Sequence, residues 1–358
     1  MTIDAILLVG GEGTRLRPLT LTTPKPMLPV AGVPLVAHQL ARARDAGIDH
    51  VVLATSYKAE LFEAAFGDGS AMGLELEYVT EVEPLGTGGG IRNVLDRLRA
   101  APEDPVAVFN GDVLSAHDLS EQIRVHVAGG AAVTLHLSEV SDPRAYGCVP
   151  TDPTGRVTDF LEKTPDPVTN RINAGCYVFR RAVIDSIPAG RPVSVERETF
   201  PALLAEGALL LGFLDAGYWL DLGTPEAFVQ GSRDMVRGVI GSSALTGEPG
   251  DSLVLDGASV APDAAVVGGS CVGVGARVGP GAVVDGSVLF AGAFVDAGAT
   301  VRDSAVGRDA VVGTDALVEG AVLGDGAHLG SGNELLRGAR LWPSAVIADR
   351  SLRFSPGP

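Results

Sequence analysis

Residues 1 to about 235 alternate between short runs of apolar residues and longer stretches with helical periodicity. The runs AILLV, VVLAT and VAVFN are apolar along nearly their whole length, whereas PLVAHQLARARDAG and GGGIRNVLDRLRA have a helical pattern. A strand that is apolar throughout is typical of a parallel sheet with helices on both faces. We therefore expect an α/β sandwich, with any ligand at the carboxyl ends of the strands.

A different pattern begins near residue 250, where glycine, alanine and valine dominate and helical periodicity is lost. An aliphatic residue now recurs at every sixth position, with occasional five-residue steps: Val260, Val266, Val272, Val278, Val284, Leu289, Val295, Val301, Val306, Val312, Val318, Leu323 and Leu329. This period is typical of a left-handed β-helix of hexapeptide repeats. A glycine-rich linker would not keep such a register. We expect two domains, over residues 1–240 and 250–350, with the five-residue steps at corners or small loops.

Charge and cysteine content exclude several classes of partner. The chain carries 27 basic against 44 acidic residues, a formal charge of -17, which argues against a nucleic-acid or anionic-membrane partner. Three scattered cysteines indicate neither a disulfide framework nor a zinc site. No apolar run approaches the ~18 residues that cross a bilayer, and no export signal is evident. We expect a cytoplasmic protein that holds any anionic ligand with a local cluster of basic residues.

Such a cluster follows the first apolar run, in the stretch GGEGTRLRPLTLTTPKP over residues 10–26. Its glycines permit a tight turn that brings N–H groups to a phosphate, and Arg15 adds a charged fork. Leu16 stands where a dinucleotide fingerprint needs its third glycine, and no G-K-[ST] follows, so neither the dinucleotide nor the P-loop motif is present. Lys25, held between Pro24 and Pro26, suits a triphosphate.

This stretch resembles the signature of sugar-1-phosphate nucleotidyltransferases, G-G-x-G-T-R-L-x-P-L-T followed by P-K-P. Five further stretches occur in the order of that family and cover essentially the whole chain: EPLGTGGG (83–90), FNGD (109–112), FLEKT (160–164), INAGCYVF (172–179) and GYWLDLGTP (217–225). The resemblance implies a Rossmann-like nucleotidyltransferase domain with a mixed, mainly parallel sheet. A hexapeptide β-helix also occurs in several branches of the family.

The resemblance also implies roles for individual residues. It implies Mg²⁺ as the cofactor, with Asp112 and Asp221 as its ligands. The implied nucleotide-binding residues are Leu8, Gly10, Gly11, Gly13, Thr14, Arg15, Lys25, Glu81, Pro84, Gly86, Thr87, Asn110 and Gly111. The implied sugar-phosphate-binding residues are Asp112, Tyr146, Gly147, Glu162, Lys163, Asn173 and Gly175. The stretch SVERETFP (194–201) matches the family too, but a helix beginning at Ser194 explains it equally well, and it stays unassigned.

The chemistry accounts for these residue types independently. In nucleotidyl transfer, a phosphate oxygen of the sugar 1-phosphate attacks the α-phosphorus of a nucleoside triphosphate, and pyrophosphate leaves in line. The protein must mainly neutralise charge and align the two anions. Arg15 and Lys25 would hold the β- and γ-phosphates, and Lys163 the attacking phosphate, which makes these three the expected catalytic residues. Carboxylate oxygens are the ligands that Mg²⁺ prefers.

The base is predicted from Glu81. In the thymidylyl- and uridylyltransferases that the chain resembles, this position is commonly glutamine. A carboxylate only accepts hydrogen bonds, and guanine presents two adjacent donors, whereas uracil or thymine would set a carbonyl oxygen against it. Such a buried mismatch costs roughly 1–3 kcal/mol, so guanine is favoured. The alternatives are that Glu81 points to solvent and Glu83 is the neighbour of the base, or that neither touches it.

With these features the chain looks most like the short, single-activity mannose-1-phosphate guanylyltransferases (GDP-mannose pyrophosphorylases). The implied substrates are GTP and mannose 1-phosphate, and the implied products are GDP-mannose and pyrophosphate. Heptose-phosphate guanylyltransferases and glucose-1-phosphate thymidylyl-, uridylyl- or adenylyltransferases remain open.

Two interpretations from other classes also remain. A non-catalytic regulatory subunit of this family could lose the residues that bind metal and phosphate. Those residues are all present here, which favours an enzyme. A β-helix acyltransferase usually needs a histidine in its coils, where His328 is the only one. We expect the β-helix instead to form a homo-oligomer.

Overall fold

The computed structural model describes residues 2–354, and the chain forms two compact units. The first unit contains the chain up to Gly11 together with Gln39–Trp219. The second contains Glu12–His38 and the chain from Leu220 onward. The glycine-rich stretch predicted to bind phosphate therefore leaves the first unit after Gly11 and continues in the second. The predicted domain limits at 1–240 and 250–350 stay a prediction.

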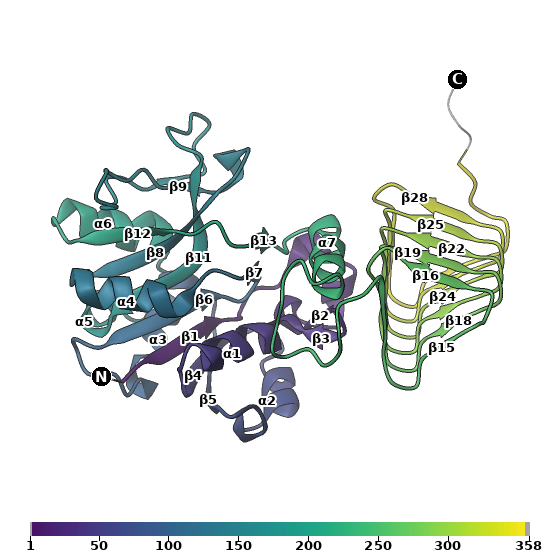
Figure 1. Ribbon diagram of the computed structural model, residues 1–358, viewed down its shortest axis with the longest axis horizontal. Coiled ribbons are helices and arrows are strands. Elements are labelled where there is room, and N and C mark those ends of the chain that lie inside the picture. Colours follow the sequence, from purple (N-terminus) through teal and green to yellow (C-terminus); the bar gives the residue numbers. More distant parts are fainter. Residues whose placement is uncertain (1, 355–358) are drawn as a thin grey trace. The chain divides into compact units, whose positions relative to one another are not determined.

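A mixed nine-stranded sheet forms the first unit (Figure 1). Its strands are β1 (Asp4–Leu8), β4 (His50–Thr55), β5 (Glu75–Thr80), β6 (Pro105–Asn110), β8 (Val133–Glu139), β9 (Gly147–Cys148), β10 (Leu161–Glu162), β11 (Arg171–Arg180) and β12 (Leu210–Leu214). The order is β10-β9-β11-β6-β1-β4-β5, with β8 between β11 and β12. β6, β1, β4 and β5 run parallel, and β11 is antiparallel to β6 and β8. The predicted mixed, mainly parallel sheet is confirmed.

Burial explains why the apolar runs become central strands. Every residue of β4 is buried, and β1 and β6 are exposed only partly and only at their last residue. The helices pack on these strands: α3 contacts β1 and β4, α4 contacts β6 and β8, and α5 contacts β11. The helices of the chain are α1 (Leu35–Asp45), α2 (Glu60–Phe66), α3 (Gly86–Asn93), α4 (Leu119–Gly129), α5 (Arg181–Ser186), α6 (Phe200–Ala205) and α7 (Pro225–Val236).

Local sequence determines where several of these helices begin. The Asp118 side chain accepts a hydrogen bond from Glu121 N–H at 2.9 Å and caps α4, and Thr224 caps α7 by accepting from Ala227 N–H at 3.2 Å. Pro225 occupies the first position of α7, where its missing N–H costs nothing. Among the described residues, no helix combines the length and apolarity required to span a membrane.

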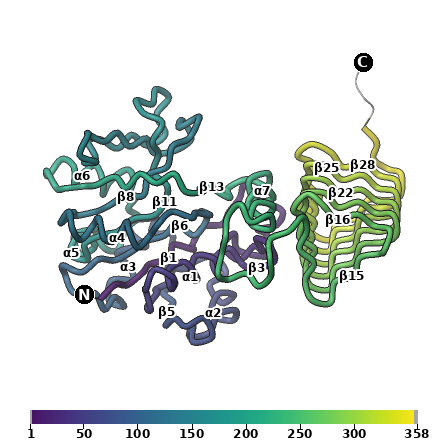
Figure 2. The backbone as a smooth tube through the Cα atoms, viewed as in Figure 1, coloured from purple at the N-terminus to yellow at the C-terminus, as the bar shows by residue number. Residues whose placement is uncertain are grey.

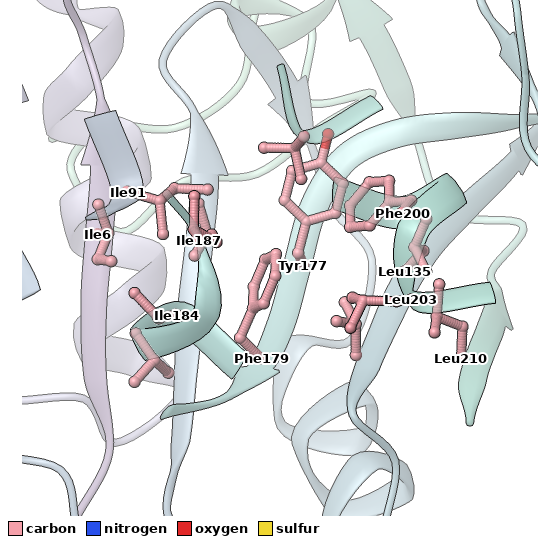
Figure 3. Close-up of a cluster of buried hydrophobic side chains, with 14 of the residues drawn as sticks. Ile6, Ile91, Leu135, Tyr177, Phe179, Ile184, Ile187, Phe200, Leu203 and Leu210 are labelled. Carbon is pink, nitrogen blue, oxygen red and sulfur yellow. The ribbon is translucent and has the colours of Figure 1, made fainter. Parts of the chain in front are cut away.

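An aromatic cluster lies in the core of the first unit, where β11 meets α6 (Figure 3). Tyr177, Phe179 and Phe200 are fully buried, and their ring centroids lie 5.2–6.1 Å apart. Leu135 and Leu210 on neighbouring strands belong to the same cluster. Because β11 is the strand that carries INAGCYVF, this packing fixes the position of the predicted sugar-binding strand.

The C-terminal part of the second unit is built from three parallel sheets of short strands (Figures 1 and 2). Their orders are β14-β17-β20-β23-β26-β29, β15-β18-β21-β24-β27-β30 and β16-β19-β22-β25-β28. The strands are β14 (Ser252–Val254), β15 (Ser259–Val260), β16 (Ala265–Val267), β17 (Ser270–Val272), β18 (Arg277–Val278), β19 (Val283–Asp285), β20 (Val288–Leu289), β21 (Phe294–Val295), β22 (Thr300–Arg302), β23 (Ala305–Val306), β24 (Val311–Val312), β25 (Leu317–Glu319), β26 (Val322–Leu323), β27 (His328–Leu329), β28 (Glu334–Leu336), β29 (Arg340–Leu341) and β30 (Val346–Ile347). This arrangement is consistent with the expected left-handed β-helix.

The five-residue steps of the sequence are shortened corners of this β-helix. Val278 pairs with Val295 and Val295 with Val312, so these coils are one residue short of three hexapeptides. The steps fall between the strands of two faces, where Ser287 and Ser304 lie fully buried. Ser304 N–H donates to Ser287 Oγ of the preceding coil at 3.1 Å, and Ser287 N–H donates likewise to Ser270 Oγ at 3.0 Å. These hydroxyls provide acceptors for backbone groups that the short corner leaves without a carbonyl.

The remaining elements of the chain are short. They comprise strands β2 (Pro29–Val30), β3 (Val33–Pro34), β7 (Val113–Ser115) and β13 (Trp219–Asp221), the 3-10 turns η1 (Thr14–Leu16), η2 (Leu19–Leu21), η3 (Lys25–Met27), η4 (Ser70–Met72), η5 (Leu95–Arg97) and η6 (Pro143–Ala145), and the π-helical turn η7 (Val195–Thr199).

A group of basic side chains is buried beneath α4 in the first unit. The rings of His117 and His136 stack with centroids 3.5 Å apart, and Arg42 lies 2.8 Å from the His117 ring. Both ring nitrogens of His136 are buried without a hydrogen-bond partner. Burial, and then the charge of Arg42, lower the pKa of His136 to about 3. Burial, followed by Arg42 and His136, lowers the pKa of His117 well below its ordinary value. These rings are therefore neutral in the folded protein at pH 7.

We expect this cluster to make the protein sensitive to acid. In the unfolded chain histidine titrates near pH 6.5, so stability is complete above that pH and falls as the pH drops toward the lowered folded value. Each such group contributes about 1.4 kcal/mol per pH unit. We measure the free energy of unfolding by urea between pH 7 and 5. It should fall less steeply with decreasing pH in His136→Leu than in the wild-type protein, by about this amount. The exposed His328→Leu is the control, and an unchanged slope in His136→Leu would contradict a neutral His136.

Candidate active site

The ends of β1 and β6 lie side by side in the first unit. Leu8 pairs with Asn110, and Gly111 N–H donates to Leu8 O at 2.9 Å. A Cβ atom at Gly111 would lie 2.5 Å from that oxygen, so only glycine fits here. The side-chain oxygen of Asn110 is buried without a hydrogen-bond partner. Asp112 follows directly and is partly exposed, so the strand ends present an amide and a carboxylate at the edge where ligands of such sheets bind.

Glu81 lies against the start of α3 instead of extending into solvent. Its Oε2 accepts a hydrogen bond from Leu85 N–H at 3.1 Å. A Cβ atom at Gly90 would lie 2.7 Å from Oε1, so the glycine run of α3 leaves room for this carboxylate. Burial raises the pKa of Glu81. Glu83, the alternative neighbour of the base, is exposed. The structure therefore places Glu81, and not Glu83, in a partly desolvated position.

Glu196 connects Thr87, near the start of α3, to the predicted sugar-binding strand β11. Its Oε2 accepts hydrogen bonds from the hydroxyl groups of Thr87 and Ser194, each at 2.8 Å. Its Oε1 lies 3.5 Å from the hydroxyl of Tyr177 on β11. Thr87 Oγ1 in turn accepts from Val195 N–H at 2.9 Å. The sequence offered no role for Glu196, because its partners lie about one hundred residues earlier and on another strand.

The stretch SVERETFP begins a helical turn, as one of the two interpretations predicts. Ser194 Oγ accepts from Arg197 N–H at 3.2 Å, and Ser194 N–H donates to Glu198 Oε1 at 3.2 Å. This reciprocal pair is a capping box one residue longer than usual, since η7 (Val195–Thr199) is a π-helical turn. Ser194 thus caps the turn and also holds Glu196.

Asn173 and Gly175 form an irregular part of β11. Asn173 Nδ2 donates to Tyr177 Oη at 2.8 Å, and its Oδ1 accepts from Gly175 N–H at 3.1 Å. The pairing of β11 with β8 shifts between Asn173 and Tyr177. Gly175 has φ +74, and a Cβ atom there would lie 2.9 Å from Asn110 Nδ2. The predicted sugar ligand Asn173 therefore uses both ends of its amide within its own strand, and Gly175 allows Asn110 to approach.

Glu162 and Lys163 lie beside Tyr146 and Gly147 because β9 and β10 pair Gly147 with Glu162. Lys163 N–H donates to Tyr146 O at 3.1 Å, and Lys163 Nζ lies 3.7 Å from Glu162 Oε1 with a side chain that is 59% exposed. Burial, and then the negative charge of Glu196, raise the pKa of Glu162, and Lys163 opposes this shift. Two partly buried carboxylates therefore face the same region of the first unit.

Trp219 is a further residue of this region that the sequence argument did not select. Its Nε1–H donates to Ala174 O of β11 at 2.9 Å, and its ring meets the ring of Tyr146 edge-on with centroids 5.4 Å apart. An aromatic residue two positions before the predicted metal ligand Asp221, within the motif GYWLDLGTP, was the available signal.

The second unit brings the predicted phosphate-binding cations onto Asp221. Lys25 Nζ lies 3.5 Å from Asp221 Oδ1, and Arg15 NH2 lies 3.8 Å from Oδ2. The Lys25 side chain is only 7% exposed, whereas that of Arg15 is 66% exposed. A Cβ atom at Gly223 would lie 2.5 Å from the Arg15 guanidinium, so the glycine after Asp221 makes room for it. The arrangement sets two cations around one carboxylate, with Arg15 free to reach an anion from solvent.

The predicted metal ligands are Asp112 in the first unit and Asp221 in the second. Within residues 2–354 no group of three or more His, Cys, Asp or Glu side chains could hold a metal ion by itself. The resemblance implies a divalent metal ion, and carboxylate oxygens fit a hard divalent cation whose other ligands are phosphate oxygens and water. The Asp221 side chain is 20% exposed and so can be reached by a metal-bound triphosphate.

The predicted glycines Gly10 and Gly13 lie in different units of the chain. Gly10 lies in the first unit, where its carbonyl accepts a hydrogen bond from Ser56 Oγ at 2.5 Å. Gly13 belongs to the second unit and has φ +61, and a Cβ atom there would lie 2.9 Å from Lys25 Cβ. The exposed members of the predicted set are Gly11, Thr14, Arg15, Pro84, Gly86 and Lys163.

Two family models match this chain. Residues 4–238 match the model described as Nucleotidyl transferase, and residues 249–352 match the one described as GMPPB C-terminal domain. Over 269 residues the chain is 61% identical to the mannose-1-phosphate guanylyltransferase of Mycobacterium tuberculosis, which covers 75% of this chain and 74% of that protein.

Two further comparisons extend the likeness. Over 228 residues the chain is 41% identical to the mannose-1-phosphate guanylyltransferase catalytic subunit beta of Drosophila pseudoobscura pseudoobscura, covering 63% of this chain and 61% of that protein. Among solved structures, HddC from Yersinia pseudotuberculosis, complexed with GMP-PN, aligns with a TM-score of 0.55 and 27% identity over 64% of this chain and 98% of that one.

Proposed function

The chain belongs to the nucleotidyl transferase family, and we propose that it transfers GMP from GTP to mannose 1-phosphate, giving GDP-mannose and pyrophosphate. The observation that carries the proposal is the convergence of Lys25 and Arg15 on Asp221, an arrangement suited to a metal-bound triphosphate. The names of the Mycobacterium tuberculosis and Drosophila relatives support the choice of substrates.

In this proposal the phosphates are held by three cations. Arg15 and Lys25 bind the β- and γ-phosphates and stabilise the negative charge that develops on the departing pyrophosphate. Lys163, exposed at its charged end, binds the phosphate of mannose 1-phosphate. That phosphate needs no general base, because it already carries the attacking oxygen as an anion. Positioning and charge neutralisation therefore supply most of the acceleration.

Mg²⁺ would be held by the carboxylates of Asp112 and Asp221, where its charge would offset that of the phosphates during transfer. Lys25 has a second role near this site. Its ammonium group lies 3.5 Å from Asp221 Oδ1 and orients that carboxylate.

Guanine recognition is assigned to Glu81. Oε2 already accepts from Leu85 N–H, which holds the carboxylate in one orientation, and each carboxylate oxygen can accept more than one hydrogen bond. The two oxygens can therefore accept from N1–H and N2–H of guanine. The HddC structure, complexed with GMP-PN, supports a guanine nucleotide in a chain of this fold.

The sugar hydroxyl groups are assigned to the carboxylates of Glu162 and Glu196, near the Tyr146–Gly147 segment. Both carboxylates are partly buried and lie close enough for one charge to affect the other. Neutral hydroxyl donors are well suited to such a pair, because they satisfy the oxygens without adding charge. Asn173 then acts mainly by shaping β11.

A substrate matrix tests the function. GTP, dTTP, UTP and ATP are crossed with the 1-phosphates of mannose, glucose and glucosamine in the presence of Mg²⁺, and pyrophosphate release is followed. GTP with mannose 1-phosphate should be fastest. A preference for dTTP with glucose 1-phosphate would reject both the base and the sugar, and absence of turnover with every pair would favour a regulatory subunit.

Glu81→Gln should reduce the preference for GTP over UTP by roughly 10-fold or more, because the amide sets a donor against one of the guanine donors. The ratio of kcat/KM for the two nucleotides measures this. Glu83→Gln, at the exposed position two residues later, is the control. If Glu81→Gln leaves the ratio unchanged, Glu81 does not bind the base.

Asp221→Asn should lower kcat by a factor of about 100 or more, because the substitution removes a metal ligand and the charge beside the buried Lys25. Glu226→Gln, at an exposed position near the start of α7, is the matched control. Both variants are assayed at saturating GTP and Mg²⁺. Full activity in Asp221→Asn would refute its role as a ligand.

We also propose that the protein is cytoplasmic and forms a homo-oligomer through its β-helix. Apolar side chains remain exposed on the outer coils: Val346 is 72% exposed, Val274 55% and Trp342 50%. Light scattering should therefore report a species larger than the 36.6 kDa chain. A single species of 36.6 kDa would reject this assembly.

A further inference from the structure

The stretch that would bind the triphosphate has little secondary structure of its own. Between Glu12 and Met27 it consists of the three 3-10 turns η1, η2 and η3, each three residues long. The backbone hydrogen bonds at η1 include those from Leu16 N–H to Gly13 O at 2.9 Å and from Arg17 N–H to Thr14 O at 3.2 Å. Turns this short are barely stable alone, so contacts from other parts of the second unit must hold the loop.

Arg340 of the β-helix supplies one such contact. Its NH1 group donates to the backbone oxygens of Arg15 at 2.8 Å and of Arg17 at 2.6 Å. These two carbonyl groups lie on either side of Leu16, at the end of η1. A charged donor forms stronger hydrogen bonds to carbonyl oxygens than a neutral one. Arg340 therefore fixes the backbone from which the Arg15 side chain extends.

Asp325 supplies a second contact from the neighbouring coil. Its Oδ2 accepts a hydrogen bond from Thr22 Oγ1 at 2.7 Å. Its Oδ1 accepts from Arg308 N–H at 2.8 Å, so the carboxylate is anchored within the β-helix itself. Asp325 follows β26, and β26 pairs with the strand of Arg340, β29. Two adjacent coils thus hold the loop on both sides of η2.

We propose that Arg340, assisted by Asp325, is a positioning residue for nucleotidyl transfer. It holds the backbone of the triphosphate loop so that Arg15 is directed toward Asp221 and the leaving pyrophosphate. The inference rests on the proposed function, and it gives the β-helix a part in catalysis in addition to association. The Arg15 side chain is 66% exposed and can adopt many orientations in water, so a fixed backbone reduces the entropy lost when it binds phosphate.

The loop is also held by contacts that do not involve the β-helix coils. Within the loop itself, Thr20 Oγ1 donates to Gly13 O at 2.8 Å. Lys25 is anchored beside Asp221. Removal of Arg340 should consequently leave the fold intact while Arg15 loses its fixed direction, and this separates a positioning role from a structural one.

Arg340→Met tests the inference, because it removes the donors and keeps most of the side-chain length. We expect kcat/KM for GTP to fall roughly 10-fold or more, with the KM for mannose 1-phosphate and the melting temperature unchanged. Arg340→Lys should restore part of the activity, since its ammonium group can still donate. Arg337→Met, at an exposed arginine between β28 and β29, is the control. Thr22→Val removes the hydrogen bond to Asp325. It should also lower kcat/KM for GTP, but by a smaller factor than Arg340→Met.

Two results would overturn the inference. One is equal activity of Arg340→Met and Arg337→Met. The other is an equal loss for both substrates accompanied by a lower melting temperature, which would assign Arg340 a structural role. If the wild-type protein prefers another nucleotide, the proposed choice of substrates is wrong. The activities of Arg340→Met and Arg337→Met are then compared with the preferred nucleotide and sugar phosphate as substrates. If it transfers to no sugar phosphate, affinity for Mg-GTP by calorimetry replaces turnover, and equal affinities of Arg340→Met and Arg337→Met reject the inference.

Discussion

The charge of Lys25 must be balanced inside the folded protein, because its side chain is almost completely removed from water. Asp221, which lies 196 residues later in the chain, provides a carboxylate at 3.5 Å. This ion pair links stretches that are far apart in the sequence, and it lies within the second unit. It joins the stretch Glu12–His38 to the chain beyond Leu220 and places the predicted phosphate loop and a predicted metal ligand in one compact unit. The turn that begins at Gly10 thus connects two units.

Each unit, taken by itself, carries a distinct set of charged side chains. The second unit contributes Lys25 and Arg15, which suit phosphate groups. The first contributes Glu81, Glu162 and Glu196, which are partly buried and accept hydrogen bonds from neutral donors such as an N–H group of a base or a sugar hydroxyl. Burial raises the pKa of Glu81 and of Glu162, because removal from water disfavours the charged form of a carboxylate. In the proposed function these local groups hold the anionic substrates, although the chain has a formal net charge of -17.

Packing in the β-helix determines what its coils can support. The aliphatic series fills the interior, and buried serines satisfy the backbone where a coil is one residue short. The packed coils carry Arg340 on β29 and Asp325 after β26. These two side chains contact the loop of 3-10 turns between Glu12 and Met27. The proposed assembly and the proposed loop support are compatible, because they are assigned to different side chains of the coils.

The sequence by itself was sufficient to determine the buried strands, the β-helix and the family, because apolar periodicity and motif order are local properties of the chain. It also indicated Lys25 and Asp221 as partners of the same ligand. Only the tertiary structure decided the polar pairings. It joined Glu196 to Thr87, committed the amide of Asn173 to its own strand, and brought Arg340 to the loop. Each of these contacts depends on the relative placement of separate elements in three dimensions, which no local pattern specifies.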